Sequence, residues 1–191
     1  QTLDGLENSL VNNEEASLLA TAENSEANDG LPGGWVEVNL SDLVRDSFTG
    51  LVRGSKDQDC SLECPYLKMN NLSINGGFET ENLVRVSATL QEVNKFTLRN
   101  GDFIFNTRNS AELVGKCGVF KVSGCEPILF NNNLLNIRFN DGVLAEIVAN
   151  WFRSSLGRRD LELATSATTS VAAIYQKSLF KLQIPHPPLA E

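Results

Sequence analysis

The stretch that best indicates the fold is NGDFIFNTRNSAELVGK, residues 100–116. Asn100 and Gly101 form a turn signal, and residues 103–105 are a short run of apolar side chains with high β-propensity. Residues 106–110 then place amides, hydroxyls and one guanidinium in a row. This pattern predicts a buried strand whose end displays hydrogen-bonding groups, which indicates recognition and not catalysis.

The rest of the chain alternates predicted strands with a few predicted helices. Strands are expected at residues 35–40, 65–69, 114–122, 134–139 and 180–184, with a turn at 131–133. Helices are expected at 41–46 with Ser41 as cap, at 87–95, at 143–156 between an Asp141 cap and a Gly157 stop, and at 168–177 with Thr168, Thr169 or Ser170 as cap. The intervening residues 46–82 are rich in Gly, Ser, Asn and Asp and predict exposed loops. Strands interleaved with helices indicate a mixed α/β domain, with a twisted mixed sheet and flanking helices.

Charge is distributed unevenly along the chain. The net charge is -8, but residues 1–30 hold seven acids and no Lys or Arg, which leaves 16 basic and 17 acidic residues from residue 31 onward. Residues 1–30 therefore predict an acidic helix remnant and linker, and residues 31–185 predict the folded domain. A nearly neutral domain binds a polyanion weakly by itself and relies on partners for further contacts.

Several classes of protein are disfavoured by what the sequence lacks. No apolar run approaches the ~20 residues of a membrane helix, and no signal peptide opens the chain, so we expect a cytoplasmic protein without membrane association. The chain does not begin with Met, and we expect the native chain to be longer.

No catalytic motif, cofactor or metal site is expected. The sequence contains no P-loop, no G-x-G-x-x-G, no H-E-x-x-H and no Asn-Pro-Pro-aromatic or Asp-Pro-Pro-aromatic tetrapeptide. Its cysteines do not follow zinc-ligand spacing, and the only histidine, His186, stands among prolines, so we expect free thiols. The four cysteines are Cys60, Cys64, Cys117 and Cys125.

Four separate pieces of the chain carry a family resemblance. They are LPGGWVEVNLSDL (31–43), PYLKMNNLSINGG (65–77), LRNGDFIFNTRNSAELVGKCGVF (98–120) and TSATTSVAAIYQKSLFKLQIPHPPLAE (165–191). In order and spacing they resemble the target recognition domain of the specificity subunit of type I restriction-modification systems. The chain stops where members of that family usually continue into a long helix, so residues 186–191 are expected to begin the connector to that helix.

The resemblance implies a division of labour. A specificity subunit reads one half of a bipartite site in double-stranded DNA, methyltransferase subunits modify adenine with S-adenosylmethionine, and a restriction subunit cuts. This chain would supply only the reading. It would be either a fragment of a longer subunit or a half-subunit that pairs with another copy. Two alternatives stay open: the recognition domain of a fused methyltransferase or restriction enzyme, and an assembly module without DNA contacts.

Candidate DNA contacts lie on three polar loops and at one basic helix end, because base edges are read by Arg, Lys, Asn, Gln, Ser and Thr. They are Thr49, Arg53, Ser55 and Lys56; Lys68, Asn70 and Asn71; Thr107, Arg108 and Asn109; and Arg153, Arg158 and Arg159. Arg108 is the first choice, and an ion pair with Glu112 is its alternative role. Asn70 and Asn71 serve equally well as turn residues, and Tyr66 is expected in the core. The three arginines of the helix end suit the helix dipole as well as they suit phosphates.

Overall fold

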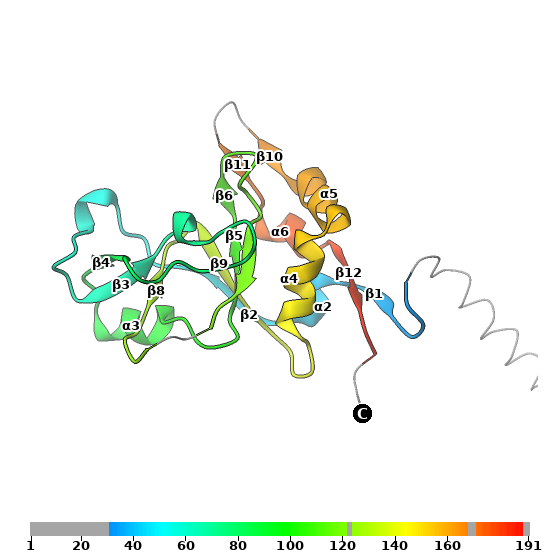
Figure 1. Ribbon diagram of the computed structural model, residues 1–191, viewed down its shortest axis with the longest axis horizontal. Coiled ribbons are helices and arrows are strands. Elements are labelled where there is room, and N and C mark those ends of the chain that lie inside the picture. The colour runs from blue at the N-terminus through cyan, green and yellow to red at the C-terminus, as the bar shows by residue number, and fades with distance from the viewer. Residues whose placement is uncertain (1–30, 122–123, 168–170, 189–191) are drawn as a thin grey trace, which may run out of the picture. The chain divides into compact units, whose positions relative to one another are not determined.

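The computed structural model describes residues 31–121, 124–167 and 171–188. The chain divides into two compact units, Gln1–Val36 and Glu37–Glu191, and the second unit holds the fold described below (Figure 1). The acidic helix remnant expected at residues 1–30 lies outside the described residues. Among the described helices, none has the length and apolar character needed to cross a membrane.

The described elements alternate strands and short helices, which confirms a mixed α/β fold. The strands are β1 (Val36–Asn39), β2 (Val44–Thr49), β3 (Cys64–Leu67), β4 (Val84–Val86), β5 (Phe103–Asn106), β6 (Arg108–Asn109), β7 (Cys117–Val119), β8 (Leu129–Phe130), β9 (Leu134–Phe139), β10 (Ser166–Ala167), β11 (Ala172–Ala173) and β12 (Gln183–His186). The helices are α2 (Leu40–Leu43), α3 (Leu90–Phe96), α4 (Ala145–Arg153), α5 (Ser155–Ala164) and α6 (Gln176–Leu179), with 3-10 turns η1 (Ser55–Asp57) and η2 (Met69–Asn71).

Within the described residues, the strands divide among four small sheets. The largest has the order β2-β9-β5-β7, and all of its pairs are antiparallel. A second sheet, β4-β3-β8, is mixed, because β3 runs antiparallel to β4 and parallel to β8. The sheets β10-β11-β6 and β1-β12 complete the set. The expected mixed pairing is therefore present, but in several sheets instead of one.

Strand β5, which lies between β9 and β7, is buried on both of its faces. Successive side chains of a strand point to opposite sides, so its residues contact two different apolar clusters. Phe103 and Phe105 face α4, where their ring centroids lie 6.4 Å and 5.9 Å from that of Phe152. Ile104 points the other way, into a second apolar cluster that contains Phe130. All five side chains are fully buried. The short apolar run at 103–105 is thus the centre of the fold, as its sequence predicts.

The helix expected at residues 143–156 is in fact two helices. The break is at Ser154, whose hydroxyl accepts a hydrogen bond from the backbone N–H of Gly157 at 3.1 Å and so caps α5. Gly157 is buried inside α5 and does not stop a helix. A Cβ atom there would lie 2.1 Å from the carbonyl oxygen of Trp151, so the glycine is needed for the close approach of the two helices.

Two expected helix caps are not used. Asn39, and not Ser41, occupies the N-cap position of α2, which is a single turn. The residues after that turn form the strand β2, although residues 44–46 were expected to continue the helix. Leu144, and not Asp141, occupies the N-cap position of α4.

The carboxyl-terminal part also differs from expectation. The helix expected at 168–177 is wrong, since Ala172–Ala173 forms a strand and the short helix α6 has Tyr175 at its N-cap position. The residues 168–170 proposed as its cap lie outside the described residues. The last strand, β12, begins later than expected and runs through His186, whose side chain is buried.

A substitution at Gly118 of β7 tests how tightly the loop that contains Gly76 packs against this strand. A Cβ atom at Gly118 would lie 2.3 Å from the backbone oxygen of Gly76, an atom that cannot move without displacing the loop. We expect Gly118→Ala to lower the free energy of unfolding by about 1–3 kcal/mol, measured by urea denaturation. Gly33→Ala is the control, since its Cβ would meet nothing within 4 Å. Equal midpoints for the two variants would contradict the packing described.

Candidate nucleic-acid interface

A cleft of about 230 Å³ opens where several strand ends of the fold meet. Its lining comes from the end of β2, the β5–β6 junction, the β8–β9 turn and the β11–α6 junction: Thr49, Thr107, Arg108, Asn132, Asn133, Leu135, Ala173, Ile174, Tyr175 and Gln176. The antiparallel register brings these segments together, because Thr49 lies opposite Leu135 and Asn106 lies opposite Leu134. The lining contains one arginine, several amides and hydroxyls, and no carboxylate.

Asn106 organises the wall of the cleft from inside. Its side chain is fully buried. Its amide nitrogen donates to the carbonyl oxygens of Arg108 and Asn133, both at 3.1 Å, and its amide oxygen accepts a hydrogen bond from the side chain of Asn109 at 2.8 Å. The polar row expected to face a ligand from residue 106 onward therefore begins with a structural residue.

Two further residues of the row hold the backbone. The Thr107 hydroxyl and backbone N–H both donate to the carbonyl oxygen of Asn133, at 3.0 Å and 2.9 Å. The amide oxygen of Asn109 accepts the backbone N–H of Ser110 at 2.9 Å, so both ends of that amide are engaged. We conclude that Asn109 shapes the loop, and that Thr107 lines the cleft with its hydroxyl already donated.

Arg108 is the exposed side chain of this row. It lies on β6, where its backbone pairs with Ala173 of β11. Within the described part of the chain its guanidinium makes no hydrogen bond or ion pair, and the pair with Glu112 considered above does not form. An exposed guanidinium without a partner is free to bind an external acceptor.

Five other side chains bring polar groups to the cleft: Thr49, Asn132, Asn133, Tyr175 and Gln176. The sequence predicts only Thr49 among them. Thr49, a predicted candidate, ends β2 and is exposed. Asn132 is half-buried in the β8–β9 turn, and Tyr175 is 57% exposed at the start of α6. Gln176 is exposed and donates one hydrogen bond to the Ser47 hydroxyl at 2.9 Å. No sequence signal separates these residues from ordinary turn and cap residues, because only the tertiary fold brings them together.

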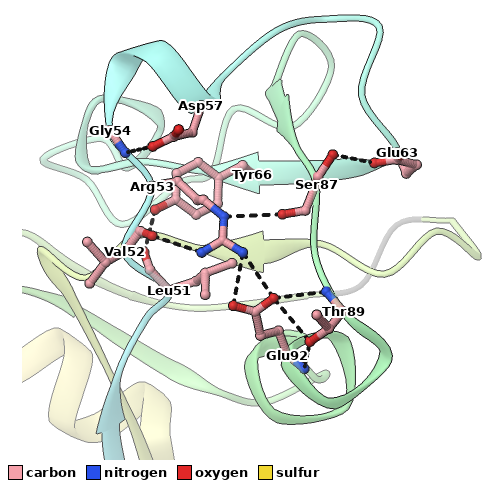
Figure 2. A network of polar contacts seen from close by, with 10 residues as sticks. All are labelled: Leu51, Val52, Arg53, Gly54, Asp57, Glu63, Tyr66, Ser87, Thr89 and Glu92. Atoms are coloured by element: carbon pink, nitrogen blue, oxygen red, sulfur yellow. Dashed lines mark hydrogen bonds and ion pairs between the residues drawn. The ribbon is translucent and has the colours of Figure 1, made fainter.

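Arg53 does not line this cleft and belongs to a separate network of polar contacts (Figure 2). Its guanidinium donates to both carboxylate oxygens of Glu92 at 2.9 Å, to the carbonyl of Ser87 at 3.2 Å and to the carbonyl of Val52 at 3.0 Å. The backbone N–H of Thr89 and then the Arg53 guanidinium hold the pKa of Glu92 below its ordinary value. Arg53 therefore fixes its loop to the start of α3 with four of the hydrogen bonds that its five N–H donors can make. Its role as a DNA contact stays a prediction.

The same network confirms the expected place of Tyr66 in the core. Its hydroxyl donates to the carbonyl oxygen of Leu51 at 2.5 Å and accepts a hydrogen bond from the Asn131 amide at 2.9 Å. Burial raises the pKa of Tyr66. This ring anchors the polar loops to the sheet that contains β3.

The second predicted loop behaves mainly as a turn. Asn71 accepts the backbone N–H of Lys68 at 2.9 Å in the cap of η2, and the Lys68 ammonium donates to Gln58 at 3.0 Å. Asn70 stays exposed on η2. On the first loop, Ser55 and Lys56 are exposed in η1.

The three arginines of the basic helix end have different surroundings. Arg153 donates to the carbonyl of Asn75 at 2.8 Å and to the Asn150 side chain at 2.6 Å. Arg158 donates to the carbonyl of Val114 at 3.2 Å. Arg159 is exposed on α5 and has no hydrogen bond or ion pair among the described residues.

The cysteines are free thiols, two of them exposed and two buried. Burial raises the pKa of Cys117 to about 12, which keeps this thiol protonated and inert. Among the described residues, no cluster of His, Cys, Asp or Glu has the arrangement of a metal site.

The chain is similar in sequence and in fold to known proteins. No family model matches the chain. The specificity subunit of the type I restriction enzyme EcoKI from Escherichia coli K12 is 25% identical over 157 residues, which cover 81% of this chain and 33% of that subunit. The chain thus spans about a third of the length of this curated relative.

Solved structures give the same result for the fold. The S subunit of a type I restriction-modification system from M. genitalium superposes with a TM-score of 0.53 and 14% identity, over 83% of this chain and 35% of that one. A chain from a structure of the assembly and conformational transition of a type I R-M system gives 0.56 and 23%, over 92% and 41%. In sequence and in fold, the chain is similar to one part of the specificity subunits of type I restriction-modification systems, which confirms the resemblance carried by its four motifs.

Proposed function

We propose that the chain recognises the sequence of duplex DNA, without catalysis of its own, as the recognition module of a type I restriction-modification system. The observation that carries the proposal is the cleft at the end of the four-stranded sheet. Its lining presents the guanidinium of Arg108, which has no hydrogen-bond or ion-pair partner among the described residues, beside amides and hydroxyls, and it contains no carboxylate. The similarity to specificity subunits supports the same role.

The groups of the cleft match the chemistry of base edges. Guanidinium and amide groups form paired hydrogen bonds with purines in the major groove, and hydroxyls bond to several bases. Arg108, Asn132 and Gln176 supply the first kinds, and Thr49 and Tyr175 supply hydroxyls. Because a carboxylate would repel the phosphates that flank a groove, its absence from the lining suits this ligand.

Contacts outside the cleft would position the duplex. We propose that four exposed side chains contact the phosphates of the duplex. They are Ser55 and Lys56 on η1, Asn70 on η2 and Arg159 on α5. We leave out of the contact set the candidates whose side chains already make hydrogen bonds within the protein. These are Arg53, Asn109 and Arg153, and also Lys68, Asn71 and Arg158, which make fewer such bonds.

The net charge of the chain and the similarity to specificity subunits support a proposal for its partners. The chain from residue 31 onward is nearly neutral, so the few phosphate contacts available give weak binding alone. We propose that methyltransferase and restriction subunits, and a second recognition half, add the remaining contacts, and that this chain reads one half of a bipartite site. The name of the curated relative favours this role over that of a fused enzyme. The free Arg108 in the cleft favours DNA contact over an assembly module without it.

We expect the 191-residue chain to bind short random duplexes weakly at low salt, with an affinity that falls as salt is raised, since phosphate contacts release counterions. Fluorescence anisotropy over a salt series measures this dependence. Selection from a random duplex pool at about 50 mM salt is then expected to enrich particular bases at fixed positions. Absence of binding at low salt, or a selected pool without any enriched position, would refute sequence recognition by this chain.

We expect Arg108→Ala to weaken binding to a selected duplex by roughly 5-fold to 100-fold, the loss typical for one base-reading arginine. The matched control is Arg99→Ala, an exposed arginine before β5, at the other end of the strand from Arg108. The affinity of this variant is expected to stay within about twofold of the wild type, because salt screens a single charge that lies far from the phosphates. If both variants lose the same affinity, the loss reflects net charge and the cleft is not the contact surface.

A further inference from the structure

The β8–β9 turn that carries Asn132 is fixed to the core on one side by Asn131. The Asn131 side chain donates to the buried hydroxyl of Tyr66 at 2.9 Å and accepts the backbone N–H of Asn133 at 2.8 Å. The Asn131 backbone N–H donates to the carbonyl of Leu67 at 2.9 Å. Asn131 itself is 8% exposed. The first residue of the turn is therefore part of the core.

On the other side the turn is fixed by the carbonyl oxygen of Asn133. This oxygen accepts three hydrogen bonds, from the Asn106 amide at 3.1 Å and from the backbone N–H and hydroxyl of Thr107 at 2.9 Å and 3.0 Å. Asn132 lies between these two anchored residues, so its backbone has little freedom. A side chain on such a backbone loses little entropy when it binds a ligand.

The amide of Asn132 differs from the other amides of the cleft lining. The Asn133 amide nitrogen lies 4.0 Å from the sulfur of Met69, and the Gln176 amide nitrogen donates to Ser47 at 2.9 Å. Asn132 is half-buried and lines the cleft, yet neither end of its amide has a hydrogen-bond partner among the described residues. Of the three amides that line the cleft, it is the one that makes no hydrogen bond to another described residue, so its donors and its acceptor are all open to a ligand.

We infer that Asn132 determines base specificity by reading an adenine in the major groove, an inference that rests on the proposed function. A side-chain amide places a donor beside an acceptor, and adenine presents the complementary pair, the N7 acceptor beside the N6 donor. Guanine presents two acceptors there, which would leave the amide oxygen of Asn132 facing a lone pair. The neighbouring Arg108, which carries donors only, suits guanine instead.

A change of one atom type tests the assignment. Asn132→Asp replaces the donor by an acceptor, and Asn94→Asp makes the same change on the exposed surface of α3 as a matched control. The wild-type chain and both variants each select duplexes from one random pool at low salt. We expect the wild type and Asn94→Asp to enrich an adenine at a shared position. Asn132→Asp is expected to lose that preference by roughly tenfold or more and to favour cytosine, whose N4 donates to carboxylates.

A second measurement uses the wild-type protein and so does not depend on how a variant folds. The selected duplex is made with 7-deazaadenine at the enriched position, which removes the N7 acceptor and keeps the N6 donor and the base pair. We expect the affinity of the wild-type chain to fall by roughly fivefold, since half of the paired contact is lost. We expect Asn132→Ala to bind the normal and modified duplexes equally.

The outcomes separate the two proposals. If the wild-type pool has no enriched position, the proposed DNA recognition fails, and the role of Asn132 fails with it. If the wild type has a sequence preference that Asn132→Asp leaves unchanged, or if 7-deazaadenine has no effect, DNA recognition stands and the assignment to Asn132 is overturned.

Discussion

The rest of the fold depends on the buried carboxylate of Asp102, which is 3% exposed. It accepts hydrogen bonds from Arg138 at 2.8 Å and 3.1 Å, from Asn136 at 2.6 Å and from the backbone N–H of Arg99 at 3.0 Å. The Arg138 guanidinium also lies 5.1 Å from the ring centre of Phe48 on β2. One buried charge thus connects the turn before β5 with β9 and β2. Loss of a partner would leave a buried charge uncompensated, so the network favours the register in which all of these contacts form.

That register positions the cleft at the other end of the same strands. Asp102 precedes β5, whereas Thr107 and Arg108 follow it, and β9 runs antiparallel beside it with Leu135 near the cleft and Arg138 near Asp102. A slip of one residue would turn every side chain of these strands to the opposite face. The groups proposed to read DNA are therefore placed by a network at the opposite end of these strands from the cleft.

Much of this core could be predicted from local signals, and the rest could not because its causes are non-local. The strands β5 and β9 are apolar runs bounded by turn residues, and both were predicted. The sequence does not predict the strand β2, because Arg45 and Asp46 are both polar and break the alternation of apolar and polar residues. The pairing of β2 with β9 also joins distant parts of the chain, which no local pattern can indicate. The sequence predicts a helix stop at Gly157, whereas its role in the structure is the close approach to the carbonyl oxygen of Trp151, which is visible only in three dimensions.

The candidate site shows the same limit at the level of single side chains. Residue type indicates what a side chain can bind, but distant partners decide whether it is already engaged: Arg53 pairs with Glu92, 39 residues away, whereas Arg108 has no such partner among the described residues. In the run Asn131, Asn132, Asn133, identical side chains have three roles. Asn131 holds the core through its side chain, and Asn133 holds β5 through its backbone carbonyl while its amide nitrogen lies 4.0 Å from the Met69 sulfur. Among the described residues, Asn132 is the one of the three whose side chain makes no internal hydrogen bond. Under the proposed function, a substitution at such a position changes the groups offered to the DNA and removes no internal hydrogen bond.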